Sequence, residues 1–234
     1  MAARSKKPQA VVEPTTPRRP APPEYPAPPW AEHRGIYGYP HKLTVRQACA
    51  SDWHLPPFQR ESVWDAERQV AYCNSLWEGL PTAPFLVWER YLGGGVMNRI
   101  NVVLDGQQRL TALGAPVLRA DGTVNPTSGA FFDLEAGRFT TEPGRWALTA
   151  KDICCMSFSD HFRGEPEDPE GSRLWQWKIY AKSRLDSIEL VSHVLESRTK
   201  PDEVVKAFRS INRPGIVFTE EEVERLIASV LTEW

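Results

Sequence analysis

The chain has 234 residues, of which 41% are hydrophobic, and it contains nine Trp and nine Phe, which is enough apolar surface for one packed domain with a tail. Its four cysteines (Cys49, Cys73, Cys154 and Cys155) show no C-x-x-C spacing, and no charged segment followed by an apolar one opens the chain. No apolar run approaches the roughly 20 residues of a membrane helix, so we expect a globular, cytoplasmic protein that does not enter a membrane.

Residues 1–29 differ in composition from the rest of the chain, because they hold nine of the 21 prolines and almost no large apolar side chains. Such a segment cannot bury enough surface to offset the entropy lost on ordering, so we expect a disordered, basic, proline-rich arm followed by a folded domain over residues 30–234. Residues 35–234 carry 22 basic and 27 acidic side chains, a net charge of −5. That balance argues against a surface that coats DNA broadly and leaves room only for a local basic pocket.

The first half of the domain predicts strands and helices in alternation. Residues 41–50 predict a short strand or turn that leads into a helix, and residues 65–79 predict a helix with Asp65 as its N-cap and Gly79 at its end. The segments "APFLVWERY" and "RINVVL" flank a glycine turn at residues 93–95, which predicts a β-hairpin whose second strand leads to Asp105.

The second half predicts a similar mixture. The expected elements are a hairpin-like middle over residues 115–139, a helix over 151–162 capped by Thr149 and Asp152, a long helix over 173–186, a strand over 187–195, a helix from Pro201, and a closing helix over 219–234. Trp175 and Trp177 of the long helix are of a type that stacks on bases, although a helix of this length more often buries them against the core or a partner. The order as a whole predicts a mixed α/β or α+β domain.

The segment "NVVLDGQQRLTAL" carries the most unusual grouping of polar residues. It predicts a strand over residues 100–104, a turn at Asp105 and Gly106, and a helix whose first turn holds Gln107, Gln108 and Arg109. The start of a helix favours an anion, and an arginine guanidinium holds phosphate through two parallel hydrogen bonds. Adjacent uncharged glutamines at a turn suit the positioning of a water or of a base edge better than a solvated face.

Asp105 allows two interpretations at this stage. As a plain N-cap it accepts from the backbone N–H of Gln107 or Gln108. As a functional residue it binds Mg²⁺ beside phosphate oxygens.

Two further segments give this motif a context. Pro56 to Arg60, followed by Trp64, contains a second Gln-Arg pair, and Phe208 to Gly215 precedes the acidic run Glu220 to Glu222. Together with the D-G-Q-Q-R segment these blocks resemble the N-terminal domain of GmrSD-type restriction endonucleases, a family of the ParB/sulfiredoxin-like superfamily. The resemblance covers about residues 43–230, and it implies a mixed sheet surrounded by helices.

The resemblance also implies a function, namely binding and hydrolysis of a nucleoside triphosphate with Mg²⁺ in control of the cleavage of modified DNA. By this correspondence the catalytic residues are Asp105, Gln107, Gln108 and Arg109, with Asp105 as the metal ligand, and the nucleotide-binding residues are Gln59, Arg60, Gly106, Arg109 and Asn212. One of the two adjacent glutamines would orient the attacking water, and the sequence does not distinguish them.

The chain also departs from its relatives, whose full-length forms carry a second domain with a histidine-based (HNH) nuclease site. Here the chain stops at Trp234, and its five histidines are scattered without metal-ligand spacing. We therefore expect a regulator without nuclease chemistry of its own, acting alone or with DNA and a separately encoded nuclease. The alternatives are a non-catalytic nucleotide-binding or DNA-binding adaptor, and a ParB-like nuclease.

Overall fold

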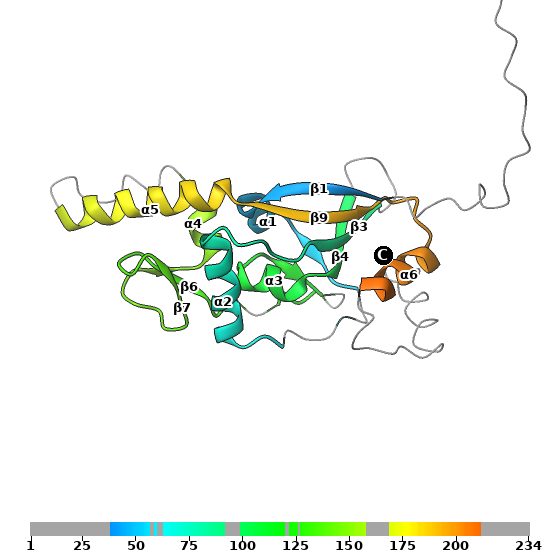
Figure 1. Ribbon diagram of the computed structural model, residues 1–234, viewed down its shortest axis with the longest axis horizontal. Coiled ribbons are helices and arrows are strands. Elements are labelled where there is room, and N and C mark those ends of the chain that lie inside the picture. The colour runs from blue at the N-terminus through cyan, green and yellow to red at the C-terminus, as the bar shows by residue number, and fades with distance from the viewer. Residues whose placement is uncertain are drawn as a thin grey trace, which may run out of the picture. The chain divides into compact units, whose positions relative to one another are not determined.

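The structure is a computed structural model (Figure 1) that describes residues 38–56, 59, 63–91, 99–119, 122–125, 127–157 and 169–211. Within these residues it contains a six-stranded sheet, a three-stranded sheet and the helices α1 to α6. The predicted arm over residues 1–29 and the predicted closing helix over residues 219–234 lie outside the described residues.

The larger sheet is mixed and has β4 near its centre. Its strand order is β1 (Gly38–Thr44), β9 (Glu189–Leu195), β3 (Phe85–Tyr91), β4 (Arg99–Asp105), β2 (Trp53–His54) and β5 (Val117–Leu118). The pairs β1–β9 and β3–β4 are antiparallel, whereas β9–β3, β4–β2 and β2–β5 are parallel. The antiparallel β3–β4 pair confirms the predicted hairpin, and its second strand ends at Asp105.

The central strands β3 and β4 are buried on both faces of the sheet, which explains their nearly continuous apolar runs. Val87 and Val103 point to the main core, which also receives side chains from α1 (Val45–Ala50), α2 (Ala66–Trp77) and α3 (Gln107–Ala112). The alternate residues Leu86, Trp88, Val102 and Leu104 point to a second cluster closed by Val204 and Phe208 of α6 (Pro201–Ile211). Helices therefore cover both faces of the sheet.

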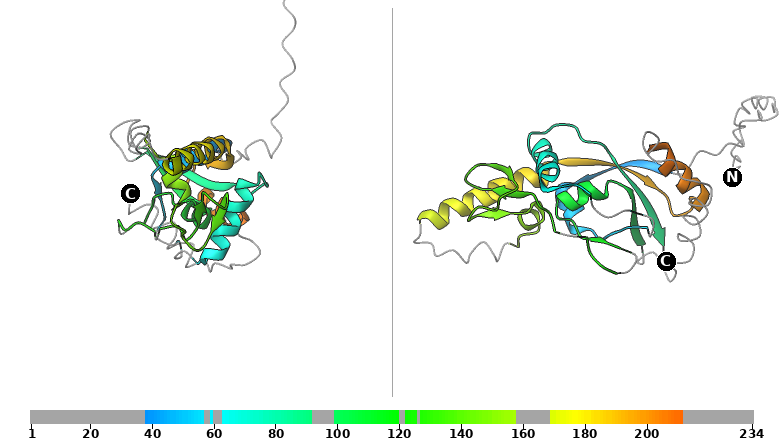
Figure 2. Two further views of the ribbon diagram at one scale, coloured as in Figure 1. Left: turned by 90° about the vertical axis from the view of Figure 1, so that its left-hand side faces the viewer. Right: turned by 90° about the horizontal axis from the view of Figure 1, so that it is seen from below.

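The smaller sheet consists of β7 (Arg138–Thr140), β6 (Phe131–Asp133) and β8 (Ala147–Leu148), all antiparallel. Phe132 and Phe139 carry it into the main core, together with buried residues of α4 (Ala150–Cys154) and α5 (Pro169–Ser187). The views in Figures 1 and 2 both place α5 alongside the β6–β7 hairpin. A cavity lies between α5 and this hairpin.

Capping residues and glycines mark the ends of several helices where the sequence predicts them. The Asp65 side chain accepts from the backbone N–H of Arg68 at 2.8 Å, and Gly79 has a φ of +80°, as the predicted cap and stop of α2 require. Thr149 and Asp152 form the predicted capping box of α4. That helix ends at Cys154, however, so the predicted extension to residue 162 is too long, and residues 158–162 lie outside the described residues.

The described part of the chain is thus a mixed α/β fold with helices around a mixed sheet, which confirms the predicted fold class. Among the described helices, none combines the length and the apolar composition needed to cross a membrane.

Candidate functional site

The D-G-Q-Q-R segment lies at the junction between β4 and α3. β4 ends at Asp105, Gly106 is the N-cap residue, and α3 begins at Gln107. The predicted strand, turn and helix are therefore confirmed. Because β4 is a central strand, the junction is largely enclosed: Gln107 and Arg109 are buried, and the Asp105 side chain keeps 32% of its accessible surface.

Gly106 is required at this junction for two separate reasons. Its φ of +107° is unfavourable for any residue with a side chain. In addition, a Cβ atom at this position would lie 2.3 Å from Cδ1 of Phe85 and 3.1 Å from Nη2 of Arg109. The backbone of the junction therefore packs directly against an aromatic ring of β3.

Arg109 is held on three sides by this packing. Its Nη1 donates to the carbonyl oxygen of Ala83 at 2.8 Å, its Nη2 donates to Oδ2 of Asp105 at 2.5 Å, and its guanidinium carbon lies 5.1 Å from the centre of the Phe85 ring. Burial raises the pKa of the Tyr72 phenol, and the charge of Arg109 lowers it in part, so the phenol remains neutral near the guanidinium. Two of the five N–H donors of the Arg109 guanidinium thus bond to other described residues.

Asp105 is not an N-cap, and that alternative interpretation was wrong. The N-cap residue of α3 is Gly106, which makes no side-chain capping bond, while the carboxylate of Asp105 forms an ion pair with Arg109 four residues later. The positive φ of Gly106 turns the chain after β4 so that the carboxylate meets the guanidinium rather than the first backbone N–H groups of the helix. Among the described residues the other oxygen, Oδ1, has no partner.

Gln107 and Gln108 have different environments although they are adjacent. The Nε2 atom of Gln107 is buried and has no hydrogen-bond partner among the described residues. By contrast, Oε1 of Gln108 accepts from the backbone N–H groups of Val63 and Trp64, both at 3.1 Å. Gln108 thus bonds the backbone at Val63 and Trp64 to α3. Gln107, in contrast, carries a buried amide donor that has no partner among the described residues.

Gln59, which belongs to the other Gln-Arg pair of the sequence, lies at the same junction. Its Nε2 donates to the carbonyl oxygen of Leu104 at 2.7 Å, beyond the point where β2 stops pairing with β4 at Val102. The side chain therefore continues the hydrogen-bonding ladder of the sheet next to Asp105. The other predicted members of the nucleotide-binding set, Arg60 and Asn212, lie outside the described residues.

Sequence reasoning missed Gln69, which also bonds to the backbone of Trp64. Gln69 is buried on α2; its Nε2 donates to the carbonyl oxygen of Trp64 at 3.2 Å and its Oε1 accepts from the backbone N–H of Gly129 at 2.7 Å. The peptide of Trp64 is thus bonded on one side by Gln108 and on the other by Gln69. A signal was present, because Gln69 precedes the buried Cys73 by one helical turn.

The arrangement fits the chemistry expected of a nucleotide site. Mg²⁺ commonly binds one or two carboxylates and takes its remaining ligands from waters and substrate phosphates, and Asp105 offers one partly exposed carboxylate oxygen of this kind. No group of three or more His, Cys, Asp or Glu side chains converges in the described ranges. A cation held by Asp105 would take further ligands from waters and substrate phosphates.

The comparisons with known proteins place this junction in a family context. The family model described as "GmrSD restriction endonuclease, N-terminal domain" matches residues 45–231. A search of curated proteins gave no match. The matched range includes both Gln-Arg pairs and every described element from α1 to α6.

Proposed function

Because the chain belongs to the family of GmrSD restriction endonuclease N-terminal domains, we propose that it binds and hydrolyses a nucleoside triphosphate at the β4–α3 junction. We further propose that this hydrolysis gates the restriction of modified DNA by a nuclease. The proposal concerns the finer chemistry, since the family itself already connects the chain with DNA restriction.

The observation that carries the proposal is the meeting of two distant Gln-containing segments at the junction. Gln59 is bonded to the residue that precedes Asp105, and Gln108 is bonded to the segment that follows Gln59 and Arg60. These bonds hold Gln59 and the backbone of Val63 and Trp64 against the D-G-Q-Q-R segment, which supports a ligand site shared by the two segments.

Two polar groups without hydrogen-bond partners among the described residues suggest which residue takes which role in hydrolysis. Asp105 presents Oδ1 and Gln107 presents a buried amide donor, and neither group has a partner among the described residues. A buried polar atom without a partner costs about 1 to 3 kcal/mol, so its retention calls for an explanation such as a ligand or a catalytic role. Gln107 is therefore our choice for the glutamine that orients the attacking water.

Arg109 contributes charge rather than a complete phosphate clamp. Its guanidinium already bonds Ala83 and Asp105, but its fixed positive charge still favours negative charge that develops on a transferring phosphoryl group nearby. Bound Mg²⁺ would be held by Asp105 and the phosphates, and it would neutralise part of the triphosphate charge.

The Asp105–Arg109 ion pair also gives weight to a second function, a non-catalytic nucleotide-binding adaptor. A carboxylate that only positions an arginine has no need of a metal, and such a protein would bind nucleotide without releasing phosphate. Both functions therefore predict nucleotide binding, but only the first predicts phosphate release.

The test is phosphate release from each nucleoside triphosphate with Mg²⁺, with and without DNA, for the natural chain and for Asp105→Asn. Asparagine keeps an oxygen that can accept from Arg109 but loses the charge that holds a cation. We expect turnover to fall on the order of 10²-fold while nucleotide binding persists, and the melting temperature should fall because the buried guanidinium of Arg109 loses its counter-charge.

A matched control is Asp65→Ala, which removes the N-cap of α2 and should cost about 1 kcal/mol of stability without affecting turnover. Full turnover in Asp105→Asn would refute the metal role of Asp105. Nucleotide binding without phosphate release under any of these conditions would favour the adaptor.

A further inference from the structure

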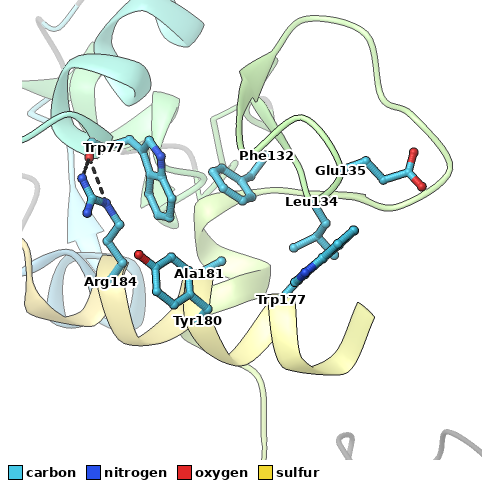
Figure 3. A pocket seen from close by; sticks show the side chains of 9 residues that line it. Trp77, Phe132, Leu134, Glu135, Trp177, Tyr180, Ala181 and Arg184 are labelled. Atoms are coloured by element: carbon cyan, nitrogen blue, oxygen red, sulfur yellow. Dashed lines mark hydrogen bonds between the residues drawn. The ribbon is translucent and has the colours of Figure 1, made fainter. Parts of the chain in front are cut away.

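A cavity of about 410 Å³ lies between α5 and the β6–β7 hairpin (Figure 3). Four of its nine lining residues are aromatic, namely Trp77 at the end of α2, Phe132 of β6, and Trp177 and Tyr180 of α5. The volume is within the range of roughly 300 to 1,000 Å³ that is typical of small-ligand pockets. None of the D-G-Q-Q-R residues lines it.

One face of α5 carries a stripe in which basic residues flank aromatic ones. Arg173, Trp177, Tyr180 and Arg184 follow one another at helical spacings of four, three and four residues, so they lie along one side of the helix. The guanidinium of Arg173 stacks 5.0 Å from the centre of the Trp177 ring. At about 1.5 Å per residue, the two arginines are separated by about 16 Å along the helix axis.

The aromatic rings of the cavity differ in how much of their surface is already used. Trp77 packs against Phe132 at 4.5 Å between ring centres, and it also carries the guanidinium of Arg184 at 4.7 Å. Arg184 is fixed in place because it donates to the carbonyl oxygen of Trp77 (Figure 3). Tyr180, in contrast, is 66% exposed. Tyr180 therefore has the most ring surface left for an occupant, and the half-buried Trp177 lies beside it on α5 with Arg173 against its ring.

We propose that this cavity binds a nucleobase of an unpaired DNA strand, stacked on Trp177 and Tyr180. Bases stack on aromatic side chains without regard to sequence, and arginines beside such rings attract the phosphates of the strand. The stripe on α5 supplies both features in one row. The proposed base site rests on the family's role in DNA restriction and does not depend on triphosphate hydrolysis.

The basic side chains beside the aromatic rings argue against a cationic occupant. Arg173 and Arg184 flank the rings, and Figure 3 shows the carboxylate of Glu135 pointing away from them. Among the described residues, a quaternary ammonium group would thus meet positive charge beside the rings and no inward-facing carboxylate. An anionic strand meets complementary charge at both ends of the stripe.

The cavity is also distinct from the junction described above. Trp64, which Gln108 and Gln69 hold, precedes the first residue of α2, whereas Trp77 is the last residue of that helix. Twelve helical residues span about 18 Å. A nucleotide at the junction and a base in the cavity can therefore occupy the protein together.

The experiment measures binding of a short, fluorescently labelled single-stranded DNA of mixed sequence at fixed salt to the full chain, to Tyr180→Ala and to Tyr91→Ala. Loss of one base–aromatic stack should weaken binding by about 5-fold to 150-fold in Tyr180→Ala. Tyr91 is an exposed tyrosine on β3, and its replacement should leave the affinity unchanged. Trp177→Phe, which retains a ring, should give an intermediate loss.

Further arms distinguish the source of the base and the independence of the site. A free mononucleotide should fail to displace the strand, and the same sequence as a paired duplex should bind without dependence on Tyr180. Asp105→Asn should bind the single strand normally, and Tyr180→Ala should release phosphate normally without DNA. The proposal is overturned if the natural chain does not bind the single strand, if Tyr180→Ala binds it as well as the natural chain, or if a mononucleotide competes for it.

Discussion

Gly106→Ala tests the central feature of the junction, the direct packing of the backbone against Phe85. The added methyl group would lie 2.3 Å from Cδ1 and 3.1 Å from Cε1 of that ring. Phe85 is 2% exposed and belongs to the main core, so the ring cannot move without displacing its neighbours. The φ of +107° adds backbone strain for any residue other than glycine.

The expected loss of stability is the sum of these two effects. Backbone strain of an L-residue at positive φ costs roughly 1 to 2 kcal/mol. Overpacking a well-packed core costs typically about 1 to 3 kcal/mol. Gly106→Ala should therefore lose about 2 to 5 kcal/mol, which is a large part of the roughly 5 to 15 kcal/mol that stabilises a typical domain.

Gly79→Ala is the matched control, because Gly79 has a φ of +80° but a Cβ atom there would meet nothing within 4 Å. This variant should show the backbone strain alone. Urea unfolding of both variants gives the two free energies, and a second substitution, Phe85→Leu, should recover part of the loss in Gly106→Ala but not in Gly79→Ala. Equal losses in the two glycine variants, within about 0.5 kcal/mol, would refute the packing argument.

Two other predictions follow from the same contacts and from the cysteines. Gln108→Ala removes the acceptor of the backbone N–H groups of Val63 and Trp64, so amide hydrogen exchange at these two residues should accelerate while exchange within β3 stays unchanged. In the natural chain a thiol reagent should label one of the four cysteines rapidly, because only Cys155 is exposed, and Cys155→Ser should remove that fast phase. Partial desolvation by its neighbours raises the pKa of the Cys155 thiol although the residue is exposed, so the labelling rate should still increase with pH at the ordinary thiol pKa of about 9. Unchanged exchange in the first case, or a rate that levels off below pH 9 in the second, would contradict these expectations.

Features of the fold that depend on neighbours in the sequence could be predicted from it. The β3–β4 hairpin, the Asp65 cap, the Thr149 capping box and the strand-to-helix turn at Asp105 all have local signals, and the structure has them where they were expected. The resemblance to the GmrSD N-terminal domain agrees with the family match over residues 45–231. Relationship to the ParB/sulfiredoxin-like superfamily stays a prediction.

Contacts between distant strands and helices could not be predicted in the same way. The role of Asp105 depends on Gly106 turning the chain and on Arg109 lying against Phe85, which belongs to another strand. A single sequence carries no direct signal for such a contact. For the same reason the long helix gave no indication that Trp177 would share a cavity with Trp77.

Gln107 and Gln69 are both buried, yet the same substitution should affect the stability of the fold in opposite directions at the two positions. A hydrogen-bonded buried amide stabilises the fold, whereas a buried amide donor without a partner opposes it, because its desolvation is not compensated. Gln107 has such an uncompensated Nε2 among the described residues, and Gln69 has both ends of its amide bonded. Leucine, which has a similar volume and no polar atoms, separates the two cases.

Gln107→Leu should therefore keep or raise the melting temperature while it abolishes phosphate release, since the group that orients water is lost and no bond of the fold is broken. Gln69→Leu should have the opposite effect on stability: it leaves the carbonyl of Trp64 and the N–H of Gly129 without partners, at a cost of about 1 to 3 kcal/mol for each buried group left unsatisfied. Thermal melts and phosphate-release rates on both variants measure the difference. A Gln107→Leu protein that is clearly less stable than the natural chain would show that the fold does use this amide. One that is equally stable and fully active would assign the attacking water to another residue. The expected combination, a stable protein without turnover, is the mark of a residue retained for chemistry at the expense of the fold.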